Sequence, residues 1–375
     1  MIPWVSPLHC MFPTNASADE PICAFVSSTF ADGRGIALLT TPTRVAEILS
    51  SEAFTEPQLP PDINDYTNPP FEERHLPGRG KGLIANKPLQ SGDRLFASTP
   101  ILMIDEAIDG LQKADRLKLS YHALHSLPES SQKKFWALAG HVDGADPFDD
   151  RVDTNSFGIE LANAEFWVIF PEIARLNHDC RPNSAYFFDP HLLTQYVHTS
   201  SPGPVPAGTE LTISYLDASL PRAARQRKLH ANWGFPCTCS LCSLSPPLSR
   251  ASDRRLARIS ELARKLGDWR AGSAAGVGMA LALVDLVEAE GLRASLPDAY
   301  VRAALQCSAL ADAWGAVRWA SRAVQVGLVE GGWRSAEVGW ARQLAEAPET
   351  HWSWGVRVGG GGIEYVEGTE EEEEE

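Results

Sequence analysis

The spacing of three cysteines constrains this chain more strongly than any other feature of its sequence. Cys237, Cys239 and Cys242 lie in one short segment after Pro236, in a chain with only seven cysteines among 375 residues. A Cys-x-Cys-x-x-Cys group offers three soft thiolate ligands, and a structural zinc site closes with a fourth. We predict that Cys180, far earlier in the chain, is the fourth ligand. Unconnected thiols in a surface loop are the alternative interpretation.

Cys180 lies in a loop where reactive side chains are unusually dense. Residues 175–184 carry two amides and an imidazole beside the thiol, between two apolar runs. Such density serves more than packing, so we predict that this loop belongs both to an organic site and, through Cys180, to a metal site. Zinc would then hold residues 237–242 over this loop as one wall of a pocket. Folding of that wall would depend on the metal.

The composition describes a globular protein with a mildly acidic body. With 44% hydrophobic residues, the chain can bury the cores of two or three domains. Its formal charge is −15, but eight glutamates fall between Glu364 and Glu375, so the rest of the chain carries only about half of that charge. A weakly acidic body lacks the basic surface that binds phosphate backbones, so we expect no direct nucleic-acid binding. It also disfavours a nucleic-acid-binding zinc ribbon.

The sequence shows neither a membrane span nor a secretory signal. No run of about eighteen apolar residues occurs, and the N-terminus lacks a basic stretch followed by an apolar core. We therefore expect an intracellular protein, in the nucleus, the cytoplasm or both, that does not engage a membrane. An odd number of cysteines with metal-type spacings also favours thiolate ligation in a reducing compartment over disulfides. On this view Cys10 and Cys23 are ordinary small residues without a ligand role.

Turn residues and hydrophobic patterns divide the chain into parts of different character. Residues 1–70 are rich in Pro, Ser, Thr and Asp, so we predict an irregular N-terminal extension with one helix, from Pro42 to Phe54. Residues 71–217 show short strands separated by turns, with a helical insertion at about 105–160. Many short strands without alternating helices predict an α+β, mostly β domain.

The remainder of the chain is predicted to be helical after the cysteine segment. Residues 218–243 contain that segment, and residues 244–249 are rich in Pro and Ser, which predicts a linker. Residues 252–345 show apolar stripes at helical spacing with small residues at the contacts. This resembles a short array of tetratricopeptide repeats (TPR), although a simple bundle fits comparably well. Residues 356–375 cannot bury apolar surface, so we expect a disordered acidic tail.

Five ordered motifs together resemble those of SET-domain protein-lysine methyltransferases. They are Gly80-Lys81-Gly82-Leu83, Asn155-Ser156-Phe157, Arg175-Leu176-Asn177-His178-Asp179-Cys180-Arg181-Pro182-Asn183, Gly208-Thr209-Glu210-Leu211-Thr212-Ile213-Ser214-Tyr215 and Cys237-Thr238-Cys239-Ser240-Leu241-Cys242. The similarity is greatest to SET and MYND proteins and fungal SET proteins with post-SET cysteines and a helical C-terminal domain, although no MYND module occurs here. It covers residues 71–243 strongly and 252–345 loosely. The resemblance implies a mostly β SET fold with a pseudoknot, a post-SET zinc site and an all-α, TPR-like C-terminal domain.

The resemblance also implies a cofactor, a substrate and the residues that bind them. The cofactor is S-adenosyl-L-methionine, and the substrate is a lysine of a protein, histone or non-histone, with the enzyme acting as a monomer. The residues implied to bind the cofactor are Arg79, Gly80, Lys81, Asn155, Asn177, His178, Tyr215 and Phe235. The implied zinc ligands, all structural, are Cys180, Cys237, Cys239 and Cys242. The implied catalytic residue is Tyr215.

Acid–base chemistry defines the role that we expect for Tyr215. Methyl transfer from a sulfonium to an amine needs alignment of nitrogen, carbon and sulfur and the exclusion of water. The lysine amine must arrive neutral, but lysine and tyrosine have ordinary pKa values of about 10.4 and about 10, so a tyrosine is a poor base near neutrality. Desolvation in an apolar channel lowers the pKa of the lysine instead. We therefore expect Tyr215 to orient the amine and stabilise charge.

Two departures from the family pattern leave a second interpretation open. Asp179 replaces the serine that is usual in the Asn-His-Ser-Cys motif, and residues 199–206 replace the usual strand end and charged turn. A chain with an impaired substrate channel would act as a SET-like scaffold. In that alternative, the helical domain and the acidic tail recruit basic protein partners.

Overall fold

The computed structural model describes residues 9–14, 20–56 and 58–360. The chain separates into two compact units. The first consists of the chain up to Leu216 together with residues 223–239, and the second of residues 217–222 together with the chain from Ser240 onward. Sheets and helices both occur in quantity, which confirms the α+β class. No helix in the described ranges is long and apolar enough to cross a lipid bilayer.

A six-stranded sheet forms the centre of the first unit. Its strand order is β1-β2-β3-β7-β9-β8, with β3 and β7 parallel and all other neighbours antiparallel. The strands are β1 (His9–Met11), β2 (Ile22–Ser27), β3 (Ile36–Thr40), β7 (Leu102–Asp105), β8 (Phe157–Leu161) and β9 (Ala164–Ile169). Every residue of β2 and β3 is buried. Both faces of the sheet are therefore covered, as continuous apolar strands require.

The two faces of β2 contribute to two different cores. Ala24 points into a core with Leu119 of helix α4 (Lys113–His125). Its neighbour Phe25 points the other way, into a core that also holds Leu83 and Leu211. The alternation of side chains along a strand thus places helices on one face of the sheet and further strands on the other.

The prediction of an irregular extension over residues 1–70 is wrong for the residues described. Both β2 and β3 lie inside the sheet. Their apolar runs at 22–26 and 36–39 are the sequence signal for these strands, but the surrounding polar residues led to the prediction of an irregular segment. The short helix α1 (Phe30–Gly33) connects them. The predicted helix begins at Pro42, but it forms two pieces, α2 (Pro42–Leu49) and α3 (Glu52–Thr55). Thr41 caps α2 by accepting a hydrogen bond from the backbone N–H of Arg44.

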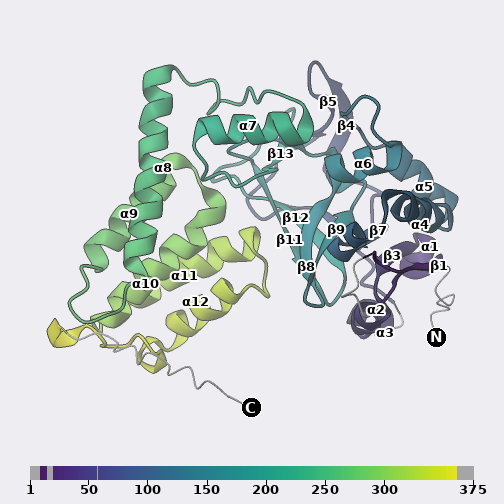
Figure 1. The fold of residues 1–375 in the computed structure, drawn as a ribbon. Helices are drawn as coiled ribbons and strands as arrows, with labels where there is room; N and C mark the ends of the chain where they lie inside the picture. Colours follow the sequence, from purple (N-terminus) through teal and green to yellow (C-terminus); the bar gives the residue numbers. More distant parts are fainter. Residues whose placement is uncertain (1–8, 15–19, 57, 361–375) are drawn as a thin grey trace, which may run out of the picture. The chain divides into compact units, whose positions relative to one another are not determined.

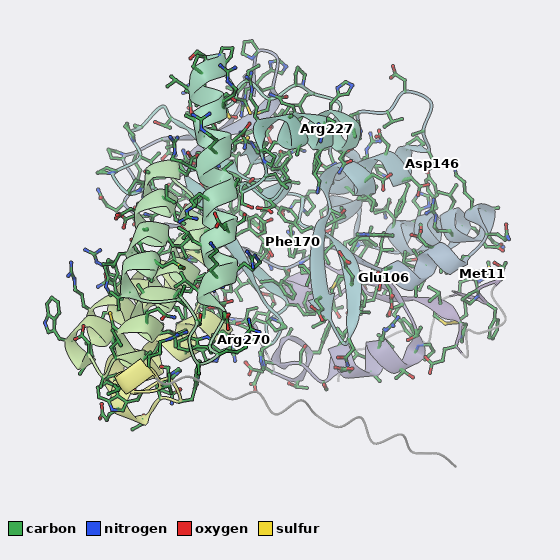
Figure 2. All side chains as sticks on the ribbon, turned by 60° about the vertical axis from the view of Figure 1, so that its left-hand side comes forward. Met11, Glu106, Asp146, Phe170, Arg227 and Arg270 are labelled. Atoms are coloured by element: carbon green, nitrogen blue, oxygen red, sulfur yellow. A yellow bond between two sulfur atoms is a disulfide. The ribbon has the colours of Figure 1, made fainter. Side chains whose placement is uncertain are left out.

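Cys10 and Cys23 form a disulfide, so their interpretation as ordinary small residues is wrong. They face each other in the antiparallel register of β1 and β2, and the bond lies beside Met11 in Figure 2. The pairing depends on the strand register, which their separation in the sequence does not reveal. Because two of the cysteines form a disulfide, the number and spacing of the cysteines no longer support a reducing compartment.

Two smaller sheets of the first unit bring the motif residues together. One has the order β10-β13-β5-β4, with β10 parallel to β13, and the other has the order β11-β12-β6. Their strands are β4 (Phe71–Leu76), β5 (Gly80–Ala85), β6 (Arg94–Ser98), β10 (Asn177–His178), β11 (Ser184–Asp189), β12 (Thr194–Thr199) and β13 (Glu210–Ile213). Strands β4 and β5 form an antiparallel hairpin, which projects at the top of the first unit in Figure 1. The motifs at residues 80–83, 175–183 and 208–215 therefore meet at one sheet although they are distant in sequence.

Helices occupy the stretch predicted as an insertion. After the 3₁₀ turn η1 (Glu106–Gly110) come α4, α5 (Glu129–Trp136) and α6 (Pro147–Asn155). The side chain of Asp146, labelled in Figure 2, caps α6 by accepting hydrogen bonds from two backbone N–H groups of the first turn. Helix α6 ends directly before β8, so it delivers Asn155 to the edge of the site. The remaining elements are η2 (Ile173–Arg175) and α7 (Arg222–Trp233).

The second unit is built from helices, which confirms the predicted helical C-terminal region. Its elements are α8 (Pro246–Leu266), α9 (Val277–Glu290), η3 (Arg293–Ser295), α10 (Leu296–Ala309), α11 (Ala313–Glu330), α12 (Ala336–Glu346), η4 (Pro348–Thr350) and η5 (Val358–Gly360). Helices α10, α11 and α12 lie side by side in Figure 1. The predicted linker at residues 244–249 is wrong in part, because α8 begins at Pro246, a residue suited to the first helical position. Most of the predicted acidic tail, residues 361–375, lies outside the described residues.

Candidate active site

The β4–β5 hairpin supplies the first part of the site. Gly78 and Gly80 adopt φ values of +73° and +69°, which L side chains rarely adopt, so the sharp turn around Arg79 depends on glycine. The Arg79 guanidinium donates a hydrogen bond of 3.0 Å to the carbonyl oxygen of His178 and pairs with the Glu210 carboxylate at 3.1 Å. Arg79 thereby ties the hairpin to β10 and β13.

Asn177 lies where three strands meet. Its Nδ2 atom donates to Oε1 of Glu210 at 2.8 Å and to the carbonyl oxygen of Lys81 at 3.2 Å. Gly82 stands so close that a Cβ atom there would lie 2.8 Å from Asn177 Nδ2 and 2.6 Å from the Leu76 side chain. The absence of a side chain at position 82 is thus what allows Asn177 to reach the hairpin.

A Gly82→Ala substitution tests this close approach. Because the new methyl group must displace the amide of Asn177, we expect the affinity for the ligand of this site to fall by about tenfold, the loss of one or two hydrogen bonds. Gly278→Ala is the matched control, since no atom lies within 4 Å of a Cβ built there. Calorimetric titration of both variants with S-adenosyl-L-methionine, the ligand that the motifs imply, measures the effect. Equal affinity in the two variants would contradict the proposed role of Asn177.

The hydrogen bonds of His178 define its tautomer. The backbone N–H of Tyr215 donates to Nδ1 at 3.0 Å, so the proton of the neutral ring is on Nε2, which lies 3.3 Å from the sulfur of Cys180. Burial, with a smaller contribution from the positive charges of Arg79 and Arg225, lowers the pKa of His178 to about 4. The imidazole is therefore neutral near pH 7, and it links the cysteine loop to the backbone of Tyr215.

Tyr215 lies at the centre of the site. Its hydroxyl donates a hydrogen bond of 2.7 Å to the carbonyl oxygen of Leu176. Its ring lies 5.4 Å from that of His178 and 5.2 Å from that of Trp233, measured between centroids. Burial raises the pKa of Tyr215 above its ordinary value, so the phenol is neutral. Because its proton is committed to Leu176, the oxygen lone pairs remain free to accept a hydrogen bond.

Two cavities meet at Tyr215. The first has a volume of about 200 Å³ and is lined by Gly78, Arg79, Asn177, His178, Tyr215, Phe235, Pro236 and Thr238. The second has a volume of about 120 Å³ and is lined by Thr154, Asn155, Ser156, Phe157, Gly158, Ala174, Leu176, Tyr186, Ile213, Ser214, Tyr215 and Trp233. Tyr215 is the residue that the two linings share. The arrangement can hold one ligand on each side of a single phenol.

The structure brings together most, but not all, of the residues implied to bind a cofactor. Arg79, Asn177, His178, Tyr215 and Phe235 share the first cavity. Asn155 lines the second cavity instead. Gly80 and Lys81 line neither cavity.

The side chains of Asn155 and Lys81 are already engaged elsewhere. The Asn155 amide nitrogen donates to the carbonyl oxygens of Ala139 at 2.7 Å and Arg151 at 2.8 Å. Only its carbonyl oxygen is left for a ligand. The half-exposed Lys81 pairs with Glu73 at 2.7 Å, so a contribution of Lys81 would come through its backbone.

Sequence reasoning missed several residues that line the cavities. Pro236 and Thr238 are adjacent in sequence to predicted site residues. They line the first cavity because the chain passes along it there. Phe157 and Tyr186 line the second cavity, and their rings touch at a centroid distance of 5.2 Å. Tyr186 is 38% exposed although it is aromatic. An exposed aromatic residue in an otherwise apolar strand is the feature that could have indicated it.

The four predicted metal ligands converge although Cys180 is distant in sequence. The sulfur atoms of Cys180, Cys237, Cys239 and Cys242 all lie within 4.8 Å of one another, and all four residues are buried. Tetrahedral zinc with Zn–S bonds of about 2.3 Å separates its sulfur ligands by roughly 3.8 Å, and the sulfurs of Cys180 and Cys237 are 4.0 Å apart. The donor set therefore fits zinc in number, chemistry and spacing.

Helix α7 fixes the cysteine segment independently of a metal. The side-chain amide of Gln226 donates to the carbonyl oxygen of Cys237 at 2.7 Å and accepts from its backbone N–H at 3.0 Å. Asp179, at the position where serine is usual, accepts a hydrogen bond of 2.8 Å from the backbone N–H of Arg181. Burial raises the pKa of Asp179 to about 6. The atypical carboxylate thus shapes the loop that holds Cys180.

Comparison with known proteins matches residues 80–216 to the SET domain family. Histone-lysine N-methyltransferase set5 of Schizosaccharomyces pombe is 28% identical over 204 residues, which cover 54% of this chain and 57% of the relative. Histone-lysine N-methyltransferase SMYD3 of Mus musculus is 37% identical over 97 residues, which cover 24% of this chain and 21% of the relative. These matches confirm the resemblance that the five motifs indicate.

The similarity to these relatives is confined to part of each protein. Histone-lysine N-methyltransferase ASHR2 of Arabidopsis thaliana is 29% identical over 108 residues, which cover 24% of this chain and 25% of the relative. The chain thus spans 57% of the length of the fission-yeast relative and a smaller share of the other two.

Proposed function

We propose that this protein, whose residues 80–216 match the SET domain family, is an S-adenosyl-L-methionine-dependent protein-lysine N-methyltransferase. The observation that supports this best is the position of Tyr215 at the junction of two cavities, with its hydroxyl proton held by Leu176. A group-transfer enzyme needs the donor and the acceptor on either side of one aligned point. A binding scaffold has no need for that arrangement, so the scaffold interpretation is not favoured.

In this proposal the first cavity holds the cofactor. When bound, S-adenosyl-L-methionine supplies an electrophilic methyl group on a sulfonium. Arg79, Gly80 and Lys81 contribute the hairpin backbone, and Asn177 and His178 contribute the strand that faces it. Phe235 supplies an aromatic face for an adenine ring. Asn155 contributes its carbonyl oxygen from the side of the second cavity.

The second cavity holds the lysine side chain. Its aromatic lining, with Phe157, Tyr186 and Trp233, excludes water and lowers the pKa of a lysine from its ordinary value of about 10.4. The Tyr215 oxygen accepts a hydrogen bond from the neutral amine and so directs the nitrogen lone pair. The nitrogen gains the methyl group as the carbon–sulfur bond breaks, and the amine proton leaves to water. Tyr215 therefore orients and does not act as the base.

A structural zinc ion held by Cys180, Cys237, Cys239 and Cys242 belongs to the same proposal. Its four thiolates leave no open position for a substrate, so the metal would fold the cavity wall and take no part in the chemistry. The imidazole of His178 joins this metal site to Tyr215. The two sites would thus be coupled through one residue.

The substrate that we propose is a lysine of a basic protein. The relatives are named as histone-lysine methyltransferases, and a histone is therefore the first substrate to test. We propose an intracellular site of action, in the nucleus or the cytoplasm, because histones and other basic proteins occur in both.

Incubation of the zinc-loaded protein with labelled S-adenosyl-L-methionine and purified histones or a whole-cell extract tests the proposed function. We expect label on lysine in at least one protein, located by mass spectrometry. Calorimetry with the cofactor provides the second readout. Cofactor binding without transfer to any protein would contradict the enzyme assignment, and failure to bind the cofactor would contradict the assignment of the first cavity.

The raised pKa of Tyr215 predicts how the reaction depends on pH. The folded state holds the phenolic proton more tightly than the unfolded chain does, so this group weakens the fold only above about pH 10. Below that value the rate should rise with pH, because the fraction of neutral lysine grows while Tyr215 does not change. Initial rates between about pH 6 and pH 10 measure this. A fall in rate as the pH rises below 10, absent from Tyr215→Phe, would show that the phenol ionises in this range and that its neutral form is required, which would contradict its raised pKa.

A further inference from the structure

Helix α11 carries an exposed ladder of tryptophan and arginine side chains. The Arg318 guanidinium lies over the rings of both Trp314 and Trp319, at 5.3 Å from each centroid. Arg322 lies over Trp319 at 5.0 Å. Positions 314, 318 and 322 follow at intervals of four and so share one face of the helix. Trp314 is 72% exposed, which is exceptional for a tryptophan.

This α11 ladder (Trp314, Arg318, Trp319 and Arg322) is anchored to the core of the second unit. Trp319 is half-buried and stacks on the buried Tyr300 at 5.7 Å. Among the described residues, neither Arg318 nor Arg322 pairs with a carboxylate, whereas other arginines of this unit do. Two guanidinium groups are therefore held in place by aromatic rings while their N–H edges remain available for an anion.

Before the described part ends, the chain returns to the end of α10, just ahead of α11. The backbone N–H of Gly355 donates to the carbonyl oxygen of Ser308, and that of Arg357 donates to Ala309, both at 2.9 Å. Exposed apolar side chains flank this junction, with Leu310 at 51% and Val358 at 59% exposure. The surface thus has an apolar end near the chain terminus and a basic end along α11.

The sequence after this surface, up to Glu375, has apolar residues first and acidic residues after them, an order complementary to the apolar and basic ends of the surface. After the glycines at 359–362 come Ile363, Tyr365 and Val366, and then the run of glutamates up to Glu375. We propose that residues 363–375 dock on the α11 ladder, with the apolar residues against Leu310, Trp314 and Val358 and the glutamates on Arg318 and Arg322.

The length of the tail permits this docking. The ladder from Trp314 to Arg322 extends about 12 Å along the helix, at 1.5 Å per residue. An extended chain covers about 3.3 Å per residue, so four or five residues beyond Gly362 span the ladder. The sequence places four glycines at 359–362 before the tail, and glycine-rich sequences permit the chain to turn back.

This docking controls when the acidic tail is available. A basic protein competes with Arg318 and Arg322 for the same glutamates, so the tail is released only where basic partners are concentrated. The inference rests on the second unit alone and does not depend on the proposed methyl transfer.

Limited proteolysis of the full-length chain with a Glu-specific protease tests the docking. Mass spectrometry gives the rates of cleavage after Glu364 and Glu367. We expect Arg318→Glu/Arg322→Glu to be cleaved at least tenfold faster than the native chain, and high salt to accelerate cleavage of the native chain because it screens the ion pairs. Trp314→Ala should show a smaller acceleration.

Arg250→Glu/Arg254→Glu in α8 is the matched control, since these arginines are exposed and have the same spacing and charge change. Its cleavage rate should equal that of the native chain, and circular dichroism verifies that all variants fold. Equal rates in the native chain and the ladder variant would overturn the proposal. So would protection that increases with protein concentration, which would place the tail on a second copy. Loss of an acidic partner protein from the ladder variant, without faster tail cleavage, would assign the surface to that partner.

Discussion

Replacing Tyr215 by phenylalanine is expected to lower the rate of methyl transfer at least about a hundredfold, while the affinity for S-adenosyl-L-methionine stays within about threefold. Removal of one hydrogen-bonding group from a preorganised site costs a factor of about 10² to 10³ when that group acts in the transition state. The Tyr215 hydroxyl is such a group in our proposal, because Leu176 holds its proton at 2.7 Å and leaves its lone pairs to the amine.

The loss of this hydroxyl must be separated from a loss of folding. A buried hydrogen bond contributes only about 1 kcal/mol to stability, so the variant should remain folded. Tyr66→Phe is the matched control, since the hydroxyls of Tyr66 and Ser98 share a hydrogen bond of 2.7 Å in the same unit, and Tyr66 lines neither of the two cavities. Single-turnover rates and calorimetry on both variants give the two quantities. Full turnover in Tyr215→Phe would refute the orienting role.

The cysteines and the crowded loop could be singled out from sequence because their chemistry is local, whereas Arg79, Tyr215 and Phe235 came only from the family resemblance. The crowded loop at 175–184 and the cysteine segment at 237–242 stand out by the types of residue they contain, and the ligand count of zinc is sufficient to connect them. Their convergence in space follows from this chemistry. The path of the chain between these two segments does not follow from their chemistry, because it depends on the parallel pairing of β10 with β13.

The contribution of residues 9–56 to the fold could not be found in the same way. Strands β2 and β3 are short and lie between polar segments, and neither alternation nor a turn of standard type marks them. Strand β3 pairs with β7, and this pairing joins residues more than sixty positions apart. Such long-range strand pairings depend on how each face of the sheet packs against its core. Ala24 and Phe25, neighbours in β2, contribute to two different cores. Local propensity carries no information on them.

The position of Asn155 illustrates a limit of transferring roles by motif. The motif residue is present, but in this chain the end of α6 uses both hydrogens of its amide to satisfy two backbone carbonyls. One of these carbonyls lies in α6 at Arg151 and the other lies before the helix at Ala139, so the amide ties the end of α6 to the preceding loop. Only the geometry shows that one oxygen is left to contact a ligand.

Replacing Cys180 by serine is expected to abolish zinc binding and, through it, to weaken cofactor binding by about tenfold or more. Structural zinc contributes directly to folding, and groups that orient a metal site commonly change its affinity by about 10- to 100-fold. Zinc content of the purified protein, measured by mass spectrometry, should fall from one ion per chain to a small fraction. Thermal unfolding of the first unit should begin at a lower temperature.

Cys307→Ser separates these effects from the loss of a buried thiol in general. Cys307 is also buried, at 3% exposure, and it lies in α10, outside the cysteine cluster. This variant should keep its zinc and its cofactor affinity. Treatment of the native protein with a zinc chelator should reproduce the effects of Cys180→Ser, and restored zinc should reverse them only in the native protein.

We expect zinc binding and cofactor binding to be coupled because a series of contacts connects the metal site to Tyr215. The sulfur of Cys180 accepts the Nε2 proton of His178, and Nδ1 of the same ring accepts the backbone N–H of Tyr215. Serine at position 180 removes the sulfur, so the His178 ring loses its partner at Nε2, and the ring that accepts the Tyr215 backbone N–H is held less firmly. Phe235 loses the support of the metal at the same time, while Gln226 still holds the Cys237 backbone. If the serine variant loses zinc but binds the cofactor as tightly as the native chain does, the metal supports the fold without shaping the cofactor site, and the coupling through His178 is wrong.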